Sequence, residues 1–206
     1  MPTSPSAKAA AVPAFKKVLQ DPAVREVFLP GGPVGVFAPH GGGIEPGTEE
    51  IARAVAQATG ATLYVLSAKR PTGNAALHVC SEDMLPGISA KLDSAVKACR
   101  MGIAIHGHGK TKGHPIYISG MAARAAKLAA DAIRNAIGAN WEVVDDQAKI
   151  PRELAGMHKN NVVNRPKEHG IQIELPRALR EEARPAIRGD ASLLVNALVE
   201  VVRHLA

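Results

Sequence analysis

Two histidines stand where apolar segments of this chain end, and a glutamate follows one of them in a glycine-rich loop. His40 opens the run His40-Gly41-Gly42-Gly43 after an apolar segment, and four residues separate it from Glu45. His106 directly follows the apolar residues 102–105. A catalytic zinc site takes three protein ligands of the imidazole or carboxylate type and keeps one position open for water. We therefore predict that His40, Glu45 and His106 form a zinc site.

The glycine run explains how His40 and Glu45 could reach the same ion. Glycine adopts backbone conformations that other residues avoid, so a tight loop can bring Glu45 back toward His40. Such a loop is needed because a spacing of five residues does not place two side chains on one face of a helix. A single histidine is more often a capping or core residue, but three candidates at strand ends favour a metal site.

Glu174 lies in a third apolar segment, residues 170–175. Metal-assisted hydrolysis needs a carboxylate that takes a proton from water and passes it to the leaving amine. A solvent-facing glutamate that alternates with Gln172 is an equally good interpretation of the residues alone. Asn164 and Arg165 precede this segment, and a guanidinium can bind a substrate carboxylate through two parallel hydrogen bonds. A surface arginine before a proline is the commoner alternative for Arg165.

The elements that would position these residues alternate between strands and helices. Apolar segments predict strands at residues 34–38, 62–66, 77–80, 102–105, 116–118, 141–144 and 171–175. Helical periodicity predicts helices that start near Thr48, as a cap, and at residues 88–99, 121–137 and 192–205. This order is typical of an α/β fold, a single-domain open mixed sheet with helices on both faces. Ligands of such sheets bind at the carboxyl ends of the strands.

We expect residues 1–29 to form an N-terminal arm with a short helix near residues 15–20, and residues 30–206 to form the α/β domain. No stretch approaches the roughly 18 apolar residues of a membrane helix, and the N-terminal residues lack the apolar core of a signal peptide. A cytoplasmic location is the expectation, and release by lysis would be compatible with it. The two cysteines, Cys80 and Cys99, are expected to be free thiols.

Composition bears on the partners of the chain. The 25 lysines and arginines exceed the 19 acidic residues, which gives a net charge of +6 that would attract an anionic substrate. The basic residues are dispersed, and a solvated basic surface explains the charge equally well. Aromatic residues make up only 3% of the chain, which argues against nucleic-acid binding by base stacking.

Several segments together resemble the poly-γ-glutamate hydrolases, a family found in bacteriophages and bacteria. The first and last are the most specific, and all occur in the family's order, at residues 39–48, 77–82, 105–107, 118–120, 161–165 and 170–180. The resemblance implies a fold similar to zinc carboxypeptidases and one Zn²⁺ per chain. It also implies cleavage of the γ-glutamyl amide bonds of poly-γ-glutamate, a polyanionic polymer.

Carried over residue by residue, the resemblance implies that His40, Glu45 and His106 bind zinc and that Glu174 is the general base. The residues that would meet the carboxylates of the substrate are Asn164, Arg165 and Arg180. Residues 69–73 match the family only loosely. His108, two residues after His106, is either a further ligand or a surface residue.

Three other functions fit part of the pattern. A zinc amidase acting on another N-acyl amino acid or on a cell-wall peptide would use the same metal site. A serine esterase would use the His-Gly-Gly-Gly run in its oxyanion hole, but it also needs a G-x-S-x-G motif that this chain lacks. A phosphate- or nucleic-acid-binding module would use the glycine loop as an anion nest.

Overall fold

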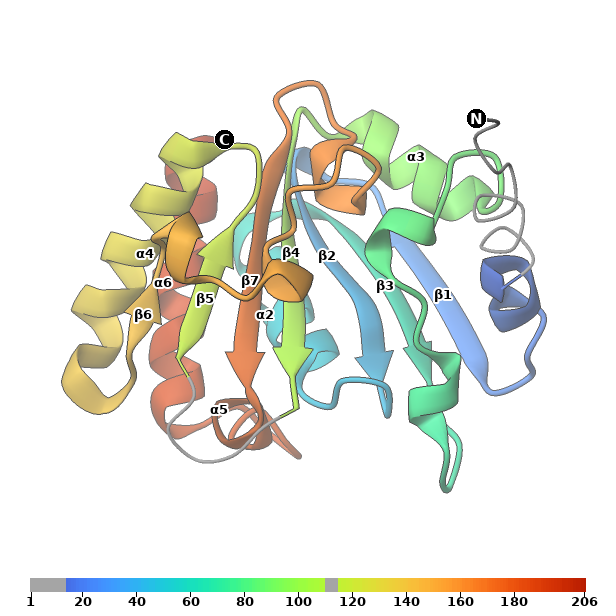
Figure 1. Cartoon of the computed structure of the whole chain (residues 1–206), viewed down its shortest axis with the longest axis horizontal. Coiled ribbons are helices and arrows are strands. Elements are labelled where there is room, and N and C mark those ends of the chain that lie inside the picture. The colour runs from blue at the N-terminus through green and yellow to red at the C-terminus, as the bar shows by residue number, and fades with distance from the viewer. Residues whose placement is uncertain (1–13, 110–114) are drawn as a thin grey trace, which may run out of the picture.

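One mixed sheet of seven strands forms the centre of the part of the chain that the structure describes, residues 14–109 and 115–206 (Figure 1). In this computed structural model the strands follow the order β1-β3-β2-β4-β7-β5-β6. Strands β3, β2, β4 and β7 run parallel, whereas β1 and β5 pair antiparallel with β3 and β7. The strand bounds are β1 Val24–Leu29, β2 Gly32–Gly42, β3 Ala61–Ala68, β4 Met101–His108, β5 Ile116–Ser119, β6 Val143–Val144 and β7 Gly170–Pro176.

Helices cover both faces of the sheet, as the sequence predicts (Figure 1). On one face lie α2 Thr48–Thr59, α4 Ala123–Ile137 and α6 Gly189–Leu205, and on the other lies α3 Ala90–Ala98. A short helix, α5 Arg177–Glu181, follows β7 directly. Single 3₁₀ turns form at η1 Asn74–Leu77, η2 Ser81–Asp83, η3 Gly138–Asn140, η4 Gln147–Lys149, η5 Arg152–Leu154 and η6 Val162–Asn164.

Alternation along the strands divides the hydrophobic core in two. In β2, Val36 and Ala38 belong to the cluster beneath α2, α4 and α6, whereas Phe37 belongs to the cluster beneath α3. In β7, Ile171 and Ile173 belong to the cluster beneath α2, α4 and α6. Gln172 and Glu174 alternate with them and therefore face the α3 side. The α3 side is therefore the face of the sheet on which polar side chains of β7 are expected.

The predicted α/β architecture and most of the predicted elements are confirmed. Six of the seven predicted strands coincide with β2, β3, β4, β5, β6 and β7, although β6 is limited to Val143–Val144. The helices α2, α3, α4 and α6 occupy the predicted positions. Strands β2 and β4 are longer than predicted, because they continue through His40 and His106.

Two local predictions were wrong. Residues 77–80 form no strand, because Val79 bonds to His40 instead of pairing in the sheet. Thr48 is not the helix cap: Gly47 is, and the Thr48 hydroxyl donates to the Glu45 carbonyl at 2.8 Å.

Residues 24–29 of the predicted arm are an edge strand paired with β3. The charged residues Arg25 and Glu26 interrupt the apolar pattern by which the other strands were predicted. Residues 14–19 are helical, as predicted for part of the arm. The first 13 residues of the predicted arm lie outside the described residues, and the division into arm and domain stays a prediction. Among the described residues, no helix is long and apolar enough to cross a membrane.

Candidate functional site

His40, His106 and Glu174 lie near the carboxyl ends of three adjacent parallel strands, β2, β4 and β7. The register of β4 against β7 places His106 directly beside Glu174, so their side chains lie on the same face of the sheet. Glu174 is 5% exposed and His106 is 4% exposed. Glu174 therefore points into the protein at this site, and the solvent-facing alternative is excluded.

A bulge in β2 brings His40 to the face that carries His106 and Glu174. Between Ala38 and Gly41 the pairing of β2 with β3 shifts by one residue, at the point where Pro39 has no N–H for the ladder. An extra residue reverses the alternation of the strand. Without the bulge, Pro39 would face the α3 side, like Phe37, and His40 would face the opposite side. With the bulge, His40 faces the α3 side.

The loop after His40 returns Glu45 to the histidine, as predicted. Gly42 has a φ of 67°, and a Cβ at this position would lie 2.5 Å from the Ala68 carbonyl oxygen, so glycine is required here. The Glu45 N–H donates to the His40 carbonyl at 2.8 Å. The Oε1 atom of Glu45 then lies 2.8 Å from Nδ1 of His40.

Four side chains converge at this point. Nδ1 of His106 lies 3.2 Å from Nδ1 of His40 and 3.7 Å from Oε2 of Glu45. Nε2 of His78 lies 3.5 Å from Oε1 of Glu45, and its ring centroid is 4.0 Å from that of His40. The ligand atoms of His40, Glu45 and His78 all lie within 4.8 Å of one another. Imidazole nitrogens and a carboxylate at these separations suit a zinc ion.

The outer nitrogen of His40 supports this assignment. Nε2 of His40 donates to the carbonyl of Val79 at 2.8 Å. Metal-binding histidines usually donate their second ring N–H to such an oxygen, which leaves the inner nitrogen free for the ion. Nδ1 of His40 is therefore the atom that would face a cation, and the donor set fits a metal.

His78 is the candidate ligand that the sequence analysis missed. It lies just after η1 and is exposed, whereas His40 and His106 are buried in strands. The sole signal in the sequence was its position in the resembling segment at residues 77–82. The sequence predicts a strand at residues 77–80 with His78 inside it, and ligands are expected at the ends of strands, so this reasoning does not point to His78.

Charges and burial shift the two glutamates of the site in opposite directions. Burial would raise the pKa of Glu45, but the charge of His40 and hydrogen bonds from His106, His40 and His78 lower it well below its usual range. Burial and the charge of Glu45 together raise the pKa of Glu174 to about 7, against the lowering effect of His106. One carboxylate therefore stays ionised for a cation, and the other can exchange a proton near neutral pH.

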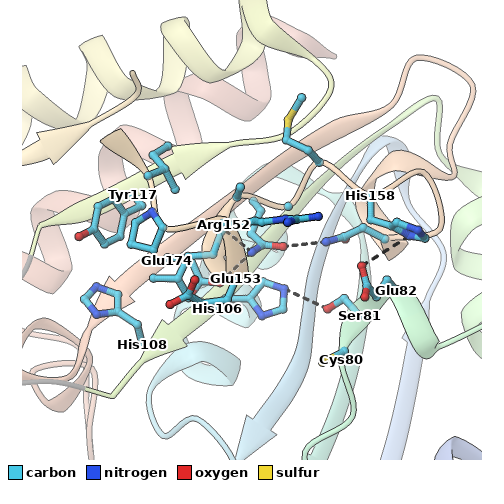
Figure 2. Close-up of a pocket in the computed structure, with 18 of the residues that line it drawn as sticks. Cys80, Ser81, Glu82, His106, His108, Tyr117, Arg152, Glu153, His158 and Glu174 are labelled. Atoms are coloured by element: carbon cyan, nitrogen blue, oxygen red, sulfur yellow. Dashed lines mark hydrogen bonds and ion pairs between the residues drawn. The ribbon is translucent and has the colours of Figure 1, made fainter. Parts of the chain in front are cut away.

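These groups lie in a cleft with a volume of about 1310 Å³. One wall consists of residues 147 and 150–158, and the other of residues 78 and 80–82. The two walls meet where Nδ1 of His158 lies 3.5 Å from Oε2 of Glu82. Figure 2 shows His106 between Glu174 and Ser81, with Tyr117 and His108 beyond Glu174. Arg152 is the one lysine or arginine among the described residues lining the cleft.

Two residues predicted to bind substrate are instead engaged with the protein. The Asn164 side-chain amide donates to the carbonyls of Gly156 and His158. Arg165 donates to the Met84 carbonyl at 2.9 Å and to Asp93 at 2.6 Å. Neither lines the cleft, because their loop folds under the wall that contains Gly156.

Arg180, the third predicted substrate residue, is 4% exposed and also lies outside the cleft lining. Its guanidinium donates to the carbonyls of Leu175, Pro46 and His108, at 3.1, 2.6 and 3.3 Å. It therefore connects the ends of β7 and β4 with the loop that follows β2, next to the cluster of histidines and Glu45. His108 lines the cleft, but its Nε2 lies 3.0 Å from the Pro115 carbonyl and its ring packs against Tyr117.

A family model described as poly-γ-glutamate hydrolase matches residues 14–186. YndL of Bacillus subtilis is 30% identical over 152 residues, which cover 73% of this chain and 56% of YndL. Its zinc-free structure superposes with a TM-score of 0.77 at 22% identity, over 90% of this chain and 92% of that one. This chain spans about half the length of the curated relatives it matches.

Other solved structures share the fold. A bacteriophage poly-γ-glutamate hydrolase superposes with a TM-score of 0.76 at 24% identity, over 89% of each chain. A protein of Burkholderia mallei assigned as a carboxypeptidase gives a TM-score of 0.50 at 14% identity, over 98% of this chain and 69% of that one. These similarities establish the carboxypeptidase-like fold. Since the family model covers most of the sequence, the chain belongs to the poly-γ-glutamate hydrolase family.

Proposed function

We propose that this protein is a zinc-dependent amidohydrolase that cleaves the γ-glutamyl amide bonds of poly-γ-glutamate. The observation that carries the proposal is the convergence of His40, Glu45 and His106 beside the buried Glu174. Membership of the family supports the reaction class.

One zinc ion per chain would be held by Nδ1 of His40, Nδ1 of His106 and the carboxylate of Glu45, with His78 within reach. When bound, zinc polarises the scissile carbonyl and lowers the pKa of water. The low pKa of Glu45 keeps this ligand ionised, and burial of His40 and His106 restricts their rotation.

Glu174 is proposed as the general base. Gln172 holds its Oε1 by a hydrogen bond of 2.7 Å, so we assign proton transfer to Oε2. This oxygen would accept a proton from the attacking water and return it to the departing α-amine of the next glutamate. In the metal-free protein the pKa of Glu174 is about 7, so this carboxyl group can both accept and donate a proton near neutral pH.

The substrate would enter the cleft between the two walls. Poly-γ-glutamate carries an α-carboxylate on every residue, and Arg152 is available to bind one of them. Its guanidinium has no hydrogen bond or ion pair within residues 14–109 and 115–206, and a carboxylate is its natural bidentate partner. A zinc amidase acting on another N-acyl amino acid or a cell-wall peptide would use the same metal site and remains the second candidate.

The anion-binding alternative receives no support from the glycine loop. An anion nest needs free backbone N–H groups, but those of Gly43 and Glu45 donate to the carbonyls of Ala68 and His40, at 2.7 and 2.8 Å. The loop is thus closed on itself and serves to bring Glu45 to the histidines.

Metal content and substrate profile together test the proposal. We expect about one zinc per chain by mass spectrometry in the wild type, and loss of zinc and activity in His106→Ala. The wild type should release γ-linked fragments from poly-γ-glutamate, whereas α-linked polyglutamate, with the same charge, should stay intact. A wild type that neither contains nor binds zinc would refute the proposal. Zinc with cleavage of cell-wall peptides alone would favour the second candidate.

A further inference from the structure

One short segment runs past the outer nitrogens of both buried histidines. The Val79 carbonyl accepts from Nε2 of His40 at 2.8 Å, and the Ser81 hydroxyl oxygen lies 3.4 Å from Nε2 of His106 (Figure 2). Ser81 is itself buried, at 7% exposure. His78, the neighbour of Glu45, belongs to the same segment.

Proton positions follow from these contacts. A carbonyl oxygen only accepts hydrogen bonds, so the proton of a neutral His40 ring is on Nε2. In His106, Nδ1 is the atom that faces His40 and Glu45. For Nδ1 to offer a lone pair to a cation, the ring proton must be on Nε2, where the Ser81 oxygen is the acceptor.

We propose that Ser81 is a positioning residue that selects the metal-binding tautomer and orientation of His106. Val79 and Ser81 together accept from the outer ring nitrogens of two proposed ligands, His40 on β2 and His106 on β4. The proposal rests on the proposed function, since it assumes that His106 binds zinc.

The expected effect follows from the burial of His106. Without the Ser81 hydroxyl, the ring N–H at Nε2 loses its acceptor, and the ring is free to turn or to move its proton to Nδ1. Loss of such an outer partner typically lowers metal affinity by about 10–100-fold. Ser81 is not one of the proposed zinc ligands, so its effect on zinc affinity would act through His106.

The test compares zinc affinity, measured by competition with a chromophoric chelator, in the wild type, Ser81→Ala and Ser81→Thr. We expect about 10–100-fold weaker binding in Ser81→Ala and recovery in Ser81→Thr, which keeps the hydroxyl. Ser119→Ala is the matched control, because Ser119 is also buried and its hydroxyl also makes a 3.4 Å contact, in this case as a donor to the Leu154 carbonyl. Its zinc affinity should equal that of the wild type.

A second measurement needs only the zinc-loaded wild type. Nitrogen-15 NMR should show His106 protonated on Nε2, with a ring N–H that exchanges slowly with solvent. Equal zinc affinity in Ser81→Ala and wild type, or a His106 protonated on Nδ1, would overturn the inference while leaving the zinc site intact. A wild type without zinc affinity would instead refute the proposed function.

Discussion

The side-chain amide of Gln172 donates a 2.7 Å hydrogen bond to Oε1 of Glu174. The orientation of that amide is itself determined, because its oxygen accepts from Nδ2 of Asn161 at 2.9 Å. Both polar residues of β7 thus lie in one hydrogen-bonded row on the cleft side of the sheet. The row holds the carboxylate that we assign as the base next to His106.

Replacing this base should separate catalysis from metal binding. In Glu174→Gln we expect kcat to fall by about 10²–10⁴-fold, the usual contribution of a general base. Zinc content should stay near that of the wild type, because Glu174 is not one of the proposed ligands. Parallel measurements of kcat and zinc content check this, with Glu200→Gln on α6 as the control. Full activity in Glu174→Gln would refute the assignment.

The raised pKa of Glu174 predicts a pH-dependent stability of the metal-free protein. Its pKa is about 7 in the folded protein against 4.5 for an unperturbed glutamate, so the folded state binds the proton more tightly. This contribution is complete below pH 4.5 and is lost as the pH rises through 7. Relative to Glu174→Gln, the wild type should lose up to about 3 kcal/mol of unfolding free energy.

Urea denaturation of both proteins at pH 5 and pH 8, in the presence of a chelator, measures this difference. Glu174→Gln should gain stability relative to the wild type as the pH rises. A difference between the two proteins that is the same at both pH values would contradict the raised pKa.

Arg152 should determine affinity for the polymer. In Arg152→Gln we expect KM for poly-γ-glutamate to rise at least about tenfold, since a hydrogen bond to a charged group contributes about 1.5–3 kcal/mol. The kcat should be nearly unchanged, because the proposed contact is to a carboxylate away from the scissile bond. Steady-state kinetics test this against Arg177→Gln, an exposed arginine of α5 outside the cleft lining. An unchanged KM would remove Arg152 from substrate binding.

Arg180 should be important for stability. Arg180→Met would leave three backbone carbonyls without their buried donor, and we expect a loss of about 2–4 kcal/mol in unfolding free energy. Arg177→Met, on the same short helix but exposed, should cost far less. Chemical denaturation of both variants measures this. If Arg180→Met is as stable as the wild type but has a raised KM, Arg180 binds the substrate, as predicted from the sequence.

Much of the fold and the centre of the site could be predicted because their signals are local. Buried strands appear as apolar segments, and His40, His106 and Glu174 stand in or just after such segments. Parallel strands place their carboxyl ends at the same edge of a sheet. The three glycines between His40 and Glu45 are also a local signal, and they predicted a loop that brings Glu45 back to His40.

What could not be predicted depends on contacts between distant segments. The guanidinium of Arg180 is held by the carbonyl of Pro46, 134 residues away, and that of His108, 72 residues away. The place of His78 beside Glu45 likewise depends on how a connecting loop crosses β2. The bulge between Ala38 and Gly41 has no periodic signal, although it decides which face His40 occupies.

The two cysteines differ in a way that matters at the bench. Cys80 is exposed and lines the cleft, whereas Cys99 is buried, and a Cβ on Gly35 would lie 2.5 Å from its Sγ. Burial raises the pKa of Cys80, as do Asp83 and Glu82, and burial raises that of Cys99 to about 11. A maleimide dye should therefore attach at Cys80 alone, faster in mildly alkaline buffer. The wild-type protein thus offers an attachment point for a fluorescent reporter of cleft occupancy, with no cysteine to be removed first.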